Sequence, residues 1–331
     1  EKFSLTGYID TYFTRDNLDK EFPLFSSINY QREKFSLNIA YLLFQYNDDS
    51  YRFKLGLQEG DIPKSIYYEE PKNIQQANIG VKLYEGLWLD AGFLTTHIGG
   101  EFTHPRLNFL SSHSSVTFFE PTYQSGFKLS YKFNENWSMD LQLLNGNHLF
   151  YDNNKQKTIG YTINYENEYL NAFYAGMTGN EEPTGAEKRN HTYHNFVIAI
   201  KLYDNLELKA QTDIASIKNP KSIIDSSGKE FAWMYGGYFQ GRYKFNERFS
   251  TSARYSVFSD VEGTYKLNVE GYDITIGAEY KPKSNSYIRL ESRFLKNTSG
   301  KNANSFVRNN RNANELIELS VNFGLWFDLK I

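Results

Sequence analysis

The sequence predicts an all-β fold: a closed antiparallel transmembrane β-barrel of about sixteen strands, with short turns at one end and long loops at the other. Three observations predict it. The C-terminal segment alternates strictly between apolar and polar residues, segments of this kind recur along the chain, and the connections between them are alternately short and long. This combination is typical of proteins that cross a membrane with strands.

The C-terminal segment, residues 315–331, carries only apolar side chains on one face of the predicted strand: Ile317, Leu319, Val321, Phe323, Leu325, Phe327 and Leu329. Successive strand residues point to opposite faces, and the intervening positions are mostly polar. On a soluble edge strand this apolar face would promote aggregation, whereas a strand between lipid and a wet lumen requires it. The segment also resembles the C-terminal signal by which outer-membrane barrels reach their insertion machinery. Membrane lipid and that machinery are therefore expected partners.

The composition agrees with a membrane protein built from strands. The 331 residues are 17% aromatic, and the mean hydropathy of −0.60 stays low because only every second strand residue would face lipid. No apolar run is long enough for a helical span. The net charge of −3 does not favour nucleic acid, and the lack of cysteine excludes disulfides and thiolate metal sites. No signal peptide begins at Glu1, so an exported protein would already have lost it.

Sixteen alternating segments follow one another, each near the length at which a tilted strand crosses a bilayer. They lie at residues 2–15, 35–47, 51–60, 75–84, 87–96, 122–133, 137–146, 157–166, 169–178, 193–203, 205–216, 231–245, 248–259, 270–281, 286–296 and 315–331. Short periplasmic turns, as at 47–50, would alternate with long extracellular loops, as at 97–121. An even strand number places both termini on the periplasmic side. No linker divides the chain, so residues 1–331 are expected to form a single outer-membrane barrel domain.

Charged side chains fall on the strand faces that would point into the lumen. In residues 270–281, for example, Ile276 would face lipid while Asp273 and Glu279 would point inward. Such charges set the ion preference of a pore, and they also pair across strands and hold the wall open. Ten basic positions against eight acidic ones predict no strong preference. The predicted pore-lining and selectivity residues are Arg52, Lys54, Lys82, Lys128, Lys132, Asp140, Arg242, Lys244, Arg254, Asp273, Glu279, Arg289, Glu291 and Arg293.

The longest connection, residues 97–121, contains four phenylalanines that need a surface to pack against. The sequence favours an inward fold in which this loop narrows the pore, opposite basic wall residues such as Arg242 and Arg254. An outer lid packed on other loops is the alternative. The predicted constriction residues are His97, Glu101, His104, Arg106 and Glu120.

Three stretches carry a resemblance to a known family. They read GYIDTYFTRD at residues 7–16, LWLDAGFLTTHIGGE at 87–101 and YQSGFKLSYKFNENWSMDLQLLNG at 123–146. The chain resembles the putative β-barrel porin-2 family of Gram-negative outer membranes, in order over most of its length and best over the first half. The resemblance implies an integral outer-membrane porin that passes small solutes. It implies no site residue.

These observations are compatible with three functions. The first is passive diffusion of small hydrophilic solutes through a water-filled lumen, because about sixteen strands leave room for a channel. The second is a barrel subunit of a larger envelope complex, with a structural or interaction role and a plugged lumen. A homo-oligomer is a further possible state of the chain. The third is a rim hydrolase built on the serines around His113, but no nucleophile elbow supports it. The histidine spacings in residues 97–121 match no metal motif. No catalytic residue, metal or cofactor is expected.

Overall fold

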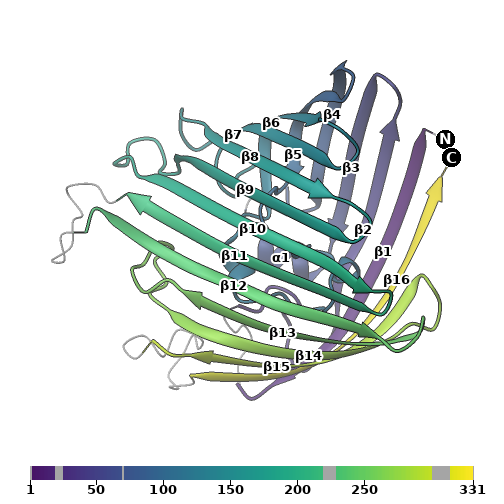
Figure 1. The fold of residues 1–331 in the computed structure, drawn as a ribbon. Coiled ribbons are helices and arrows are strands. Elements are labelled where there is room, and N and C mark those ends of the chain that lie inside the picture. The colour runs from purple at the N-terminus through teal and green to yellow at the C-terminus, as the bar shows by residue number, and fades with distance from the viewer. Residues whose placement is uncertain (1, 19–24, 69–70, 219–228, 300–313, 331) are drawn as a thin grey trace.

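The computed structural model shows a closed antiparallel barrel of sixteen strands (Figure 1). The structure describes residues 2–18, 25–68, 71–218, 229–299 and 314–330. The strands are β1 (Phe3–Asp16), β2 (Phe35–Asn47), β3 (Tyr51–Glu59), β4 (Ile74–Tyr84), β5 (Leu87–Thr95), β6 (Tyr123–Lys132), β7 (Trp137–Leu144), β8 (Thr158–Glu166), β9 (Leu170–Asn180), β10 (Asn190–Tyr203), β11 (Leu206–Lys218), β12 (Phe231–Lys244), β13 (Phe249–Ser259), β14 (Glu270–Tyr280), β15 (Ser286–Asn297) and β16 (Glu315–Lys330). The predicted fold class and strand number are confirmed.

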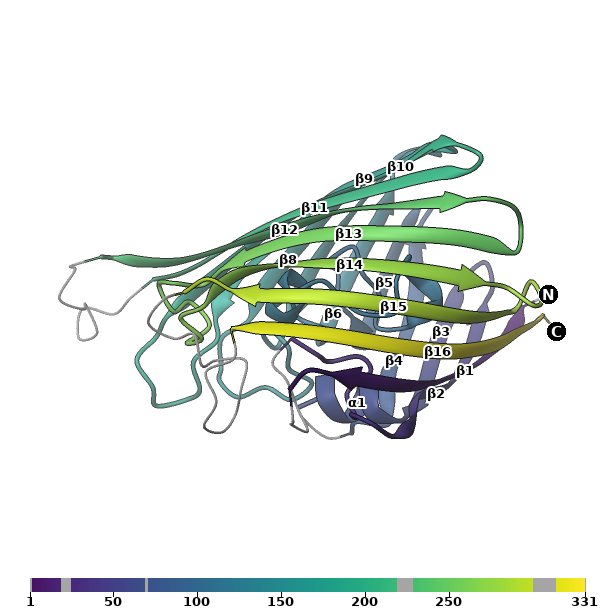
Figure 2. The same ribbon diagram turned by 90° about the horizontal axis from the view of Figure 1, so that it is seen from below.

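The barrel closes through pairing of its first and last strands. β1 runs antiparallel to β16, from Ser4 opposite Lys330 to Asp16 opposite Glu318. Each remaining strand pairs with its neighbours in sequence, so no edge is left open. Closure matters because an unpaired peptide group costs several kcal/mol in hydrocarbon. Figure 2 shows both chain ends at the end of the barrel opposite the long loops, as the even strand number predicted.

The two faces of each strand differ as the alternation predicted. On β14, Ile276 is 58% exposed on the outer surface, whereas its neighbour Thr275 is fully buried inside. The same contrast runs along β16, where Leu319 and Leu325 are exposed and Asn322 is buried. Every second residue therefore contributes to an apolar outer band, and the polar residues between them line the interior.

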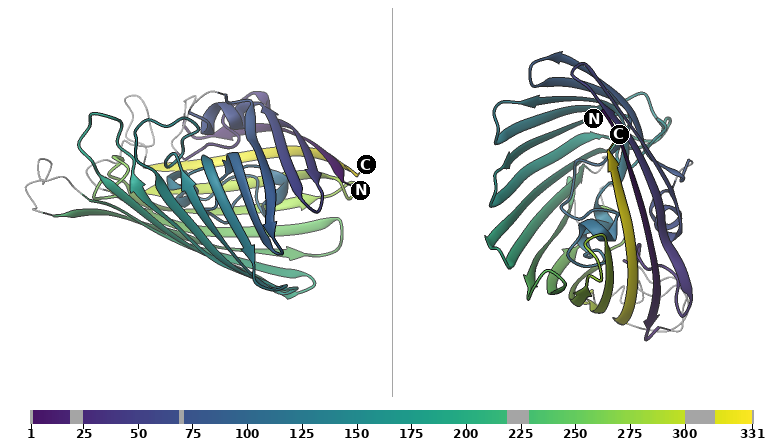
Figure 3. Two further views of the ribbon diagram at one scale, coloured as in Figure 1. Left: turned by 90° about the horizontal axis from the view of Figure 1, so that it is seen from above. Right: turned by 90° about the vertical axis from the view of Figure 1, so that its right-hand side faces the viewer.

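Parts of the connections fold into the barrel. They contain short helices where the sequence predicted loops. Helix α1 (Asp61–Ile66) follows β3, and two 3-10 turns, η1 (Pro105–Leu107) and η2 (Val116–Phe119), lie between β5 and β6. The right-hand panel of Figure 3 shows the blue segment between β5 and β6 inside the ring of strands. Among the described residues, no helix is long and apolar enough to cross a membrane.

The lipid-facing register is testable at two neighbouring residues in the middle of β8. Ile163 is 46% exposed on the outer face, and Thr162 points inward beside Asp140 of β7. Ile163→Arg places a charge in hydrocarbon and should cost about 2–4 kcal/mol. Thr162→Arg gains an acidic neighbour and should fold nearly as well as the parent. The measurement is the folded yield and the urea midpoint after refolding into liposomes. Equal damage from both variants would mean that the faces are exchanged.

Candidate functional site: loop L3 in the barrel lumen

The candidate site is the loop between β5 and β6, here called L3 (residues 97–121), which lies against the inner wall. Its first turn is held by side chains of three strands. His97 contacts Gln124 Oε1 at 3.0 Å and the Gly176 carbonyl oxygen at 3.1 Å. The Gly99 and Gly100 amides donate to Asn195 Oδ1 at 3.1 Å and to Gln211 Oε1 at 2.7 Å.

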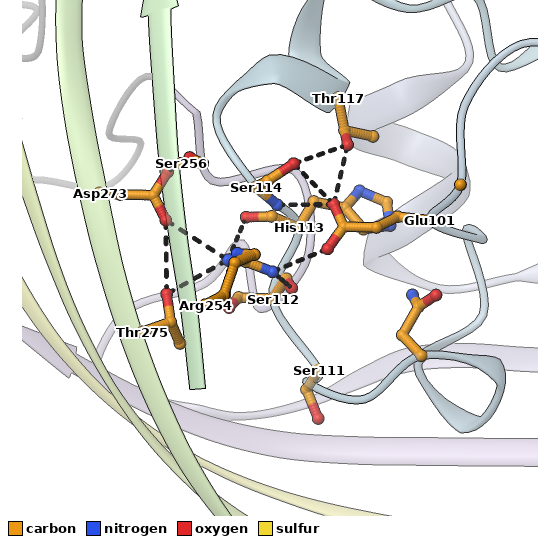
Figure 4. Close-up of polar contacts among 12 residues, drawn as sticks. Glu101, Ser111, Ser112, His113, Ser114, Thr117, Arg254, Ser256, Asp273 and Thr275 are labelled. Carbon is orange, nitrogen blue, oxygen red and sulfur yellow. Dashed lines mark hydrogen bonds and ion pairs between the residues drawn. The ribbon is translucent and has the colours of Figure 1, made fainter. Parts of the chain in front are cut away.

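A fully buried arginine on β13, Arg254, joins the middle of L3 to the wall (Figure 4). Its Nη1 donates to Glu101 Oε1 at 2.9 Å and to the Ser112 carbonyl oxygen at 2.6 Å. Its Nη2 donates to the His113 carbonyl oxygen at 2.8 Å and lies 3.6 Å from Asp273 Oδ1. The planar guanidinium therefore binds two carboxylates and two loop carbonyls in one fixed geometry.

Wall and loop carboxylates accept the amides and hydroxyls of the serine-rich stretch of L3. Glu291 of β15 accepts bonds from the Ser111 amide and, at 2.9 Å, from Ser112 Oγ. Asp273 of β14 accepts the Ser115 amide at 3.0 Å and its Oγ at 2.5 Å. Within the loop, Glu101 Oε2 accepts the Ser114 amide and hydroxyl, both at 2.8 Å. Serine suits these positions because its small side chain lets the backbone approach and donates a second bond.

Two further buried arginines on β15 extend this attachment. Arg289 pairs with Glu279 at 2.5 Å and donates to the Pro105 carbonyl oxygen of L3 at 3.1 Å. Arg293 donates to Ser115 Oγ at 3.1 Å and to the Phe25 carbonyl oxygen at 2.8 Å, so it also holds the connection after β1. We call Arg254, Arg289, Arg293 and their carboxylates Glu101, Asp273, Glu279 and Glu291 the arginine cluster.

The described part of the connection after β1 enters the lumen in the same way. Arg32 pairs with Asp16 at 2.5 Å and with Glu318 of β16 at 2.7 Å. Asn29 donates to Asn322 Oδ1 at 3.0 Å. Neither residue was identified from the sequence, because an asparagine and an arginine in a loop carry no sign of partners almost 300 positions away.

Burial controls the ionisation of the loop residues. Burial, reinforced by Arg106, lowers the pKa of His104 to about 3. Gln75 Nε2 lies 2.8 Å from His104 Nε2, where the amide donates to an unprotonated ring nitrogen. Burial opposes ionisation of Glu101, but Arg254 and His113 outweigh it and hold its pKa below the usual value. Burial and then the nearby Asp213 raise the pKa of Glu120 well above its usual value.

The predicted site residues divide into two groups. One group is buried between L3 and the wall: Arg254, Asp273, Glu279, Arg289, Glu291, Arg293, Glu101, His104 and Glu120. The other keeps contact with the lumen and comprises Arg52, Lys54, Lys82, Lys128, Lys132, Asp140, Arg242 and Lys244. His97 and Arg106 are partly buried. The sequence predicted that charged residues of the loop would lie opposite basic wall residues such as Arg242 and Arg254. Glu101 and Arg254 form a direct ion pair. Arg242 instead pairs with Glu207 and lies 4.4 Å from the Phe109 ring centre.

A cavity of about 270 Å³ lies between part of L3 and the wall of β2–β5. It is bounded by Tyr41 of β2, Gln76 of β4 and Thr95 of β5, and by Phe102 and His104 of L3. The loop is therefore bonded to β10–β15 on one side, and beside the cavity it is also held by Gln75 of β4, at His104, and by Tyr8 of β1, at the Arg106 amide.

In the contacts described, the serines of L3 bond to carboxylates, arginines and other hydroxyl groups, and none of them bonds to a histidine. His113 Nε2 lies 2.8 Å from the Phe102 carbonyl oxygen. Across the described ranges, no group of three or more His, Asp or Glu side chains is arranged to hold a metal ion.

Comparison with known proteins places the chain among outer-membrane barrels. The family profile described as "Putative beta-barrel porin-2, OmpL-like" matches residues 2–327. OmpF of Salmonella typhi in complex with daunomycin is similar in structure, with TM-score 0.67, 13% identity and coverage of 98% of this chain and 97% of that one. The anion-selective porin from Comamonas acidovorans has TM-score 0.63 and 10% identity over 98% and 99% of the two chains. The trimer form of OmpT from Vibrio cholerae has TM-score 0.64 and 12% identity over 98% and 99%. No curated protein sequence matches the chain.

Removing the central arginine should release L3 without opening the barrel. Arg254→Gln leaves Glu101 and Asp273 buried without their shared partner, a loss of about 3–5 kcal/mol for a buried ion pair. Hydrogen exchange of residues 101–115, followed by mass spectrometry, should become much faster than in the parent. Arg248→Gln, in an exposed short turn between β12 and β13, is the control and should change nothing. Unchanged exchange in the Arg254 variant would show that other contacts hold the loop.

Acid should weaken the docking of L3 through His104. Its pKa falls from 6.5 to about 3 in the docked loop, so docking is fully stable above pH 6.5 and weakens as the pH drops toward 3. The loss is about 1.4 kcal/mol per pH unit. Glu120 acts in the opposite sense, since its raised pKa favours docking in acid. When the pH is lowered from about 7 to about 5, fluctuations of the single-channel current should therefore increase in the parent. The increase should be smaller in His104→Gln. Equal pH responses would exclude His104 as the cause.

Proposed function

Since the chain belongs to the putative beta-barrel porin-2, OmpL-like family of outer-membrane barrels, we propose that small hydrophilic solutes diffuse through its lumen along the side of L3 that faces β2–β5. The observation that carries this proposal is the cavity that L3 leaves on the side facing β2–β5. The arginine cluster fills the space toward β13–β15, whereas the cavity of about 270 Å³ lies on the opposite side. The loop acts as a fixed partition that narrows the passage.

The same geometry supports an orientation in the membrane. Both termini and the short turns lie at one end, which we assign to the periplasm, and the long loops then face outward. The apolar face of β16 fits delivery by the outer-membrane insertion machinery. We further propose that residues 97–121 are the constriction of a single barrel domain. The basic side chains that face the pore would then set the ion preference of the channel.

A second candidate function is a barrel subunit with a plugged lumen. It is favoured by one observation: L3 is not alone inside the barrel, because Asn29 and Arg32 of the connection after β1 are also buried in polar networks there. A homo-oligomer is compatible with both functions, as OmpT of Vibrio cholerae has a trimer form. Conductance separates the two candidates.

Shortening L3 should widen the passage. Deletion of residues 103–117 removes the partition and should raise single-channel conductance in planar bilayers well above that of the parent and weaken its ion preference. Because this deletion strips partners from buried charges, a second variant is needed. Gln76→Trp adds bulk on the cavity side without touching the arginine cluster, and it should lower conductance.

Two results would contradict the proposal. A parent barrel that folds but passes no current, together with a copurifying envelope protein, would favour the plugged subunit. A Gln76→Trp variant with parental conductance would place the passage elsewhere.

A further inference from the structure

The inner wall of β3–β6 carries three cations beside a single carboxylate, Asp90, and we propose that Arg52, Lys54 and Lys128 form a binding site for small oxyanions, carboxylate or phosphate, that makes the channel prefer anions. This inference rests on the proposed function and names the solute class that the passage favours. These three cations remain in contact with the lumen when L3 is in place.

Arg52 is the fixed member of this basic cluster. Its Nε donates to Asp90 Oδ1 at 2.7 Å and its Nη2 to Asp90 Oδ2, and its guanidinium lies 4.4 Å from the Trp88 ring centre. Gly80 leaves the space for this pair, because a Cβ there would come within 2.3 Å of Asp90 Oδ1. Asp90 carries one negative charge, so once it is paired with Arg52 it cannot neutralise a second cation as well.

Lys54 and Lys128 are the cations without a full partner. Lys128 Nζ is 4.0 Å from Asp90 Oδ2, at the limit of an ion pair and on an oxygen that Arg52 already binds. Lys54 lies two residues beyond Arg52 on the same face of β3, with no carboxylate within ion-pair distance in the part of the chain that the structure describes. Half-buried cations of like charge repel one another, and an anion between them relieves that repulsion.

Other inward carboxylates of the barrel could balance these positive charges in number, but they do not lie beside them. Asp273 and Glu291 are buried between L3 and the wall, and Glu101 of L3, which also borders the cavity, is paired with Arg254. The lumen side of the opposite wall repeats the excess of base, because Arg242 and Lys244 share Glu207 at 2.5 and 2.9 Å. Burial by L3 therefore separates the charges, and the passage keeps a surplus of positive groups.

A poorly screened surplus of one sign concentrates the opposite ion and sets the selectivity of a narrow pore. Chloride would be the weakest ligand of the site, since it cannot make the paired bonds that a carboxylate or phosphate makes with a guanidinium and ammonium groups. A small oxyanion should therefore bind and transiently block chloride current.

The test uses the full chain in planar bilayers. Reversal potentials in a potassium chloride gradient should show anion preference in the parent, and inorganic phosphate should reduce the chloride current. Lys54→Gln with Lys128→Gln should lower the anion-to-cation permeability ratio about fivefold, roughly the effect of a unit charge near 4 Å in water, and abolish the phosphate block. Asp90→Asn should raise the ratio. Lys283→Gln, in an exposed turn outside the lumen, is the matched control and should leave both unchanged.

The outcomes separate this inference from the proposed function. A parent that conducts but prefers cations, or a double variant with parental selectivity and block, overturns the anion site and leaves the channel standing. A parent that does not conduct overturns the channel. In that case titration calorimetry with phosphate on the folded barrel decides the site: binding lost in the double variant supports it, and no binding to the parent overturns it.

Discussion

A peptide group left unpaired in hydrocarbon is too costly to keep, and the rest of this structure depends on that constraint. It requires β1 to pair with β16 along almost their whole lengths, and it fixes the alternation of every strand between lipid and lumen. Sixteen strands then enclose more space than the wall side chains fill. L3 and the first connection occupy part of that space, and their backbone must find partners on a wall that is polar because the apolar positions face lipid.

Buried charge is the means by which L3 meets this wall. A buried ion pair adds little net stability, since desolvation offsets most of the attraction, but removing one partner is costly. Arg254 thus mainly fixes the position of L3, because it binds Glu101 and two loop carbonyls in a geometry that other arrangements of the loop do not reproduce. The serines complete the fit, because each offers an amide and a hydroxyl to a wall or loop carboxylate. On its other side L3 touches Gln75 of β4 and Tyr8 of β1, and the cavity lies beside these contacts.

Strands were predictable because membrane alternation is a local pattern. The segment 231–245 was predicted and β12 spans Phe231–Lys244, since Trp233, Phe239 and Tyr243 share one face and Gln240 and Arg242 the other. Short helix α1 was missed because six residues carry too little periodicity. At β2 the register shifts opposite Asp10 and Thr11 and turns Asn38 into the core, which no alternation in the sequence indicates.

The candidate site was only partly predictable for a different reason. The rings of L3 indicated that it packs against something, but the partners of its charged residues lie far along the chain: Arg254 is 153 positions from Glu101, and Glu291 is 179 from Ser112. The alternation that placed Arg254 and Asp273 on the inner face could not distinguish a side chain in water from one beneath a loop. For that reason the near balance of inward charges in the sequence conceals the separation that the structure shows.

The central claim is that L3 stays attached to β13–β15 while solutes pass on its other side, and a disulfide tests it most directly. The chain has no cysteine, and the Ser115 amide lies 3.4 Å from Ser256 Oγ of β13. In the variant Ser115→Cys with Ser256→Cys, oxidation should link the two residues and leave single-channel conductance unchanged. Failure to form the bond in the folded barrel, or loss of current on oxidation that reduction restores, would contradict the account.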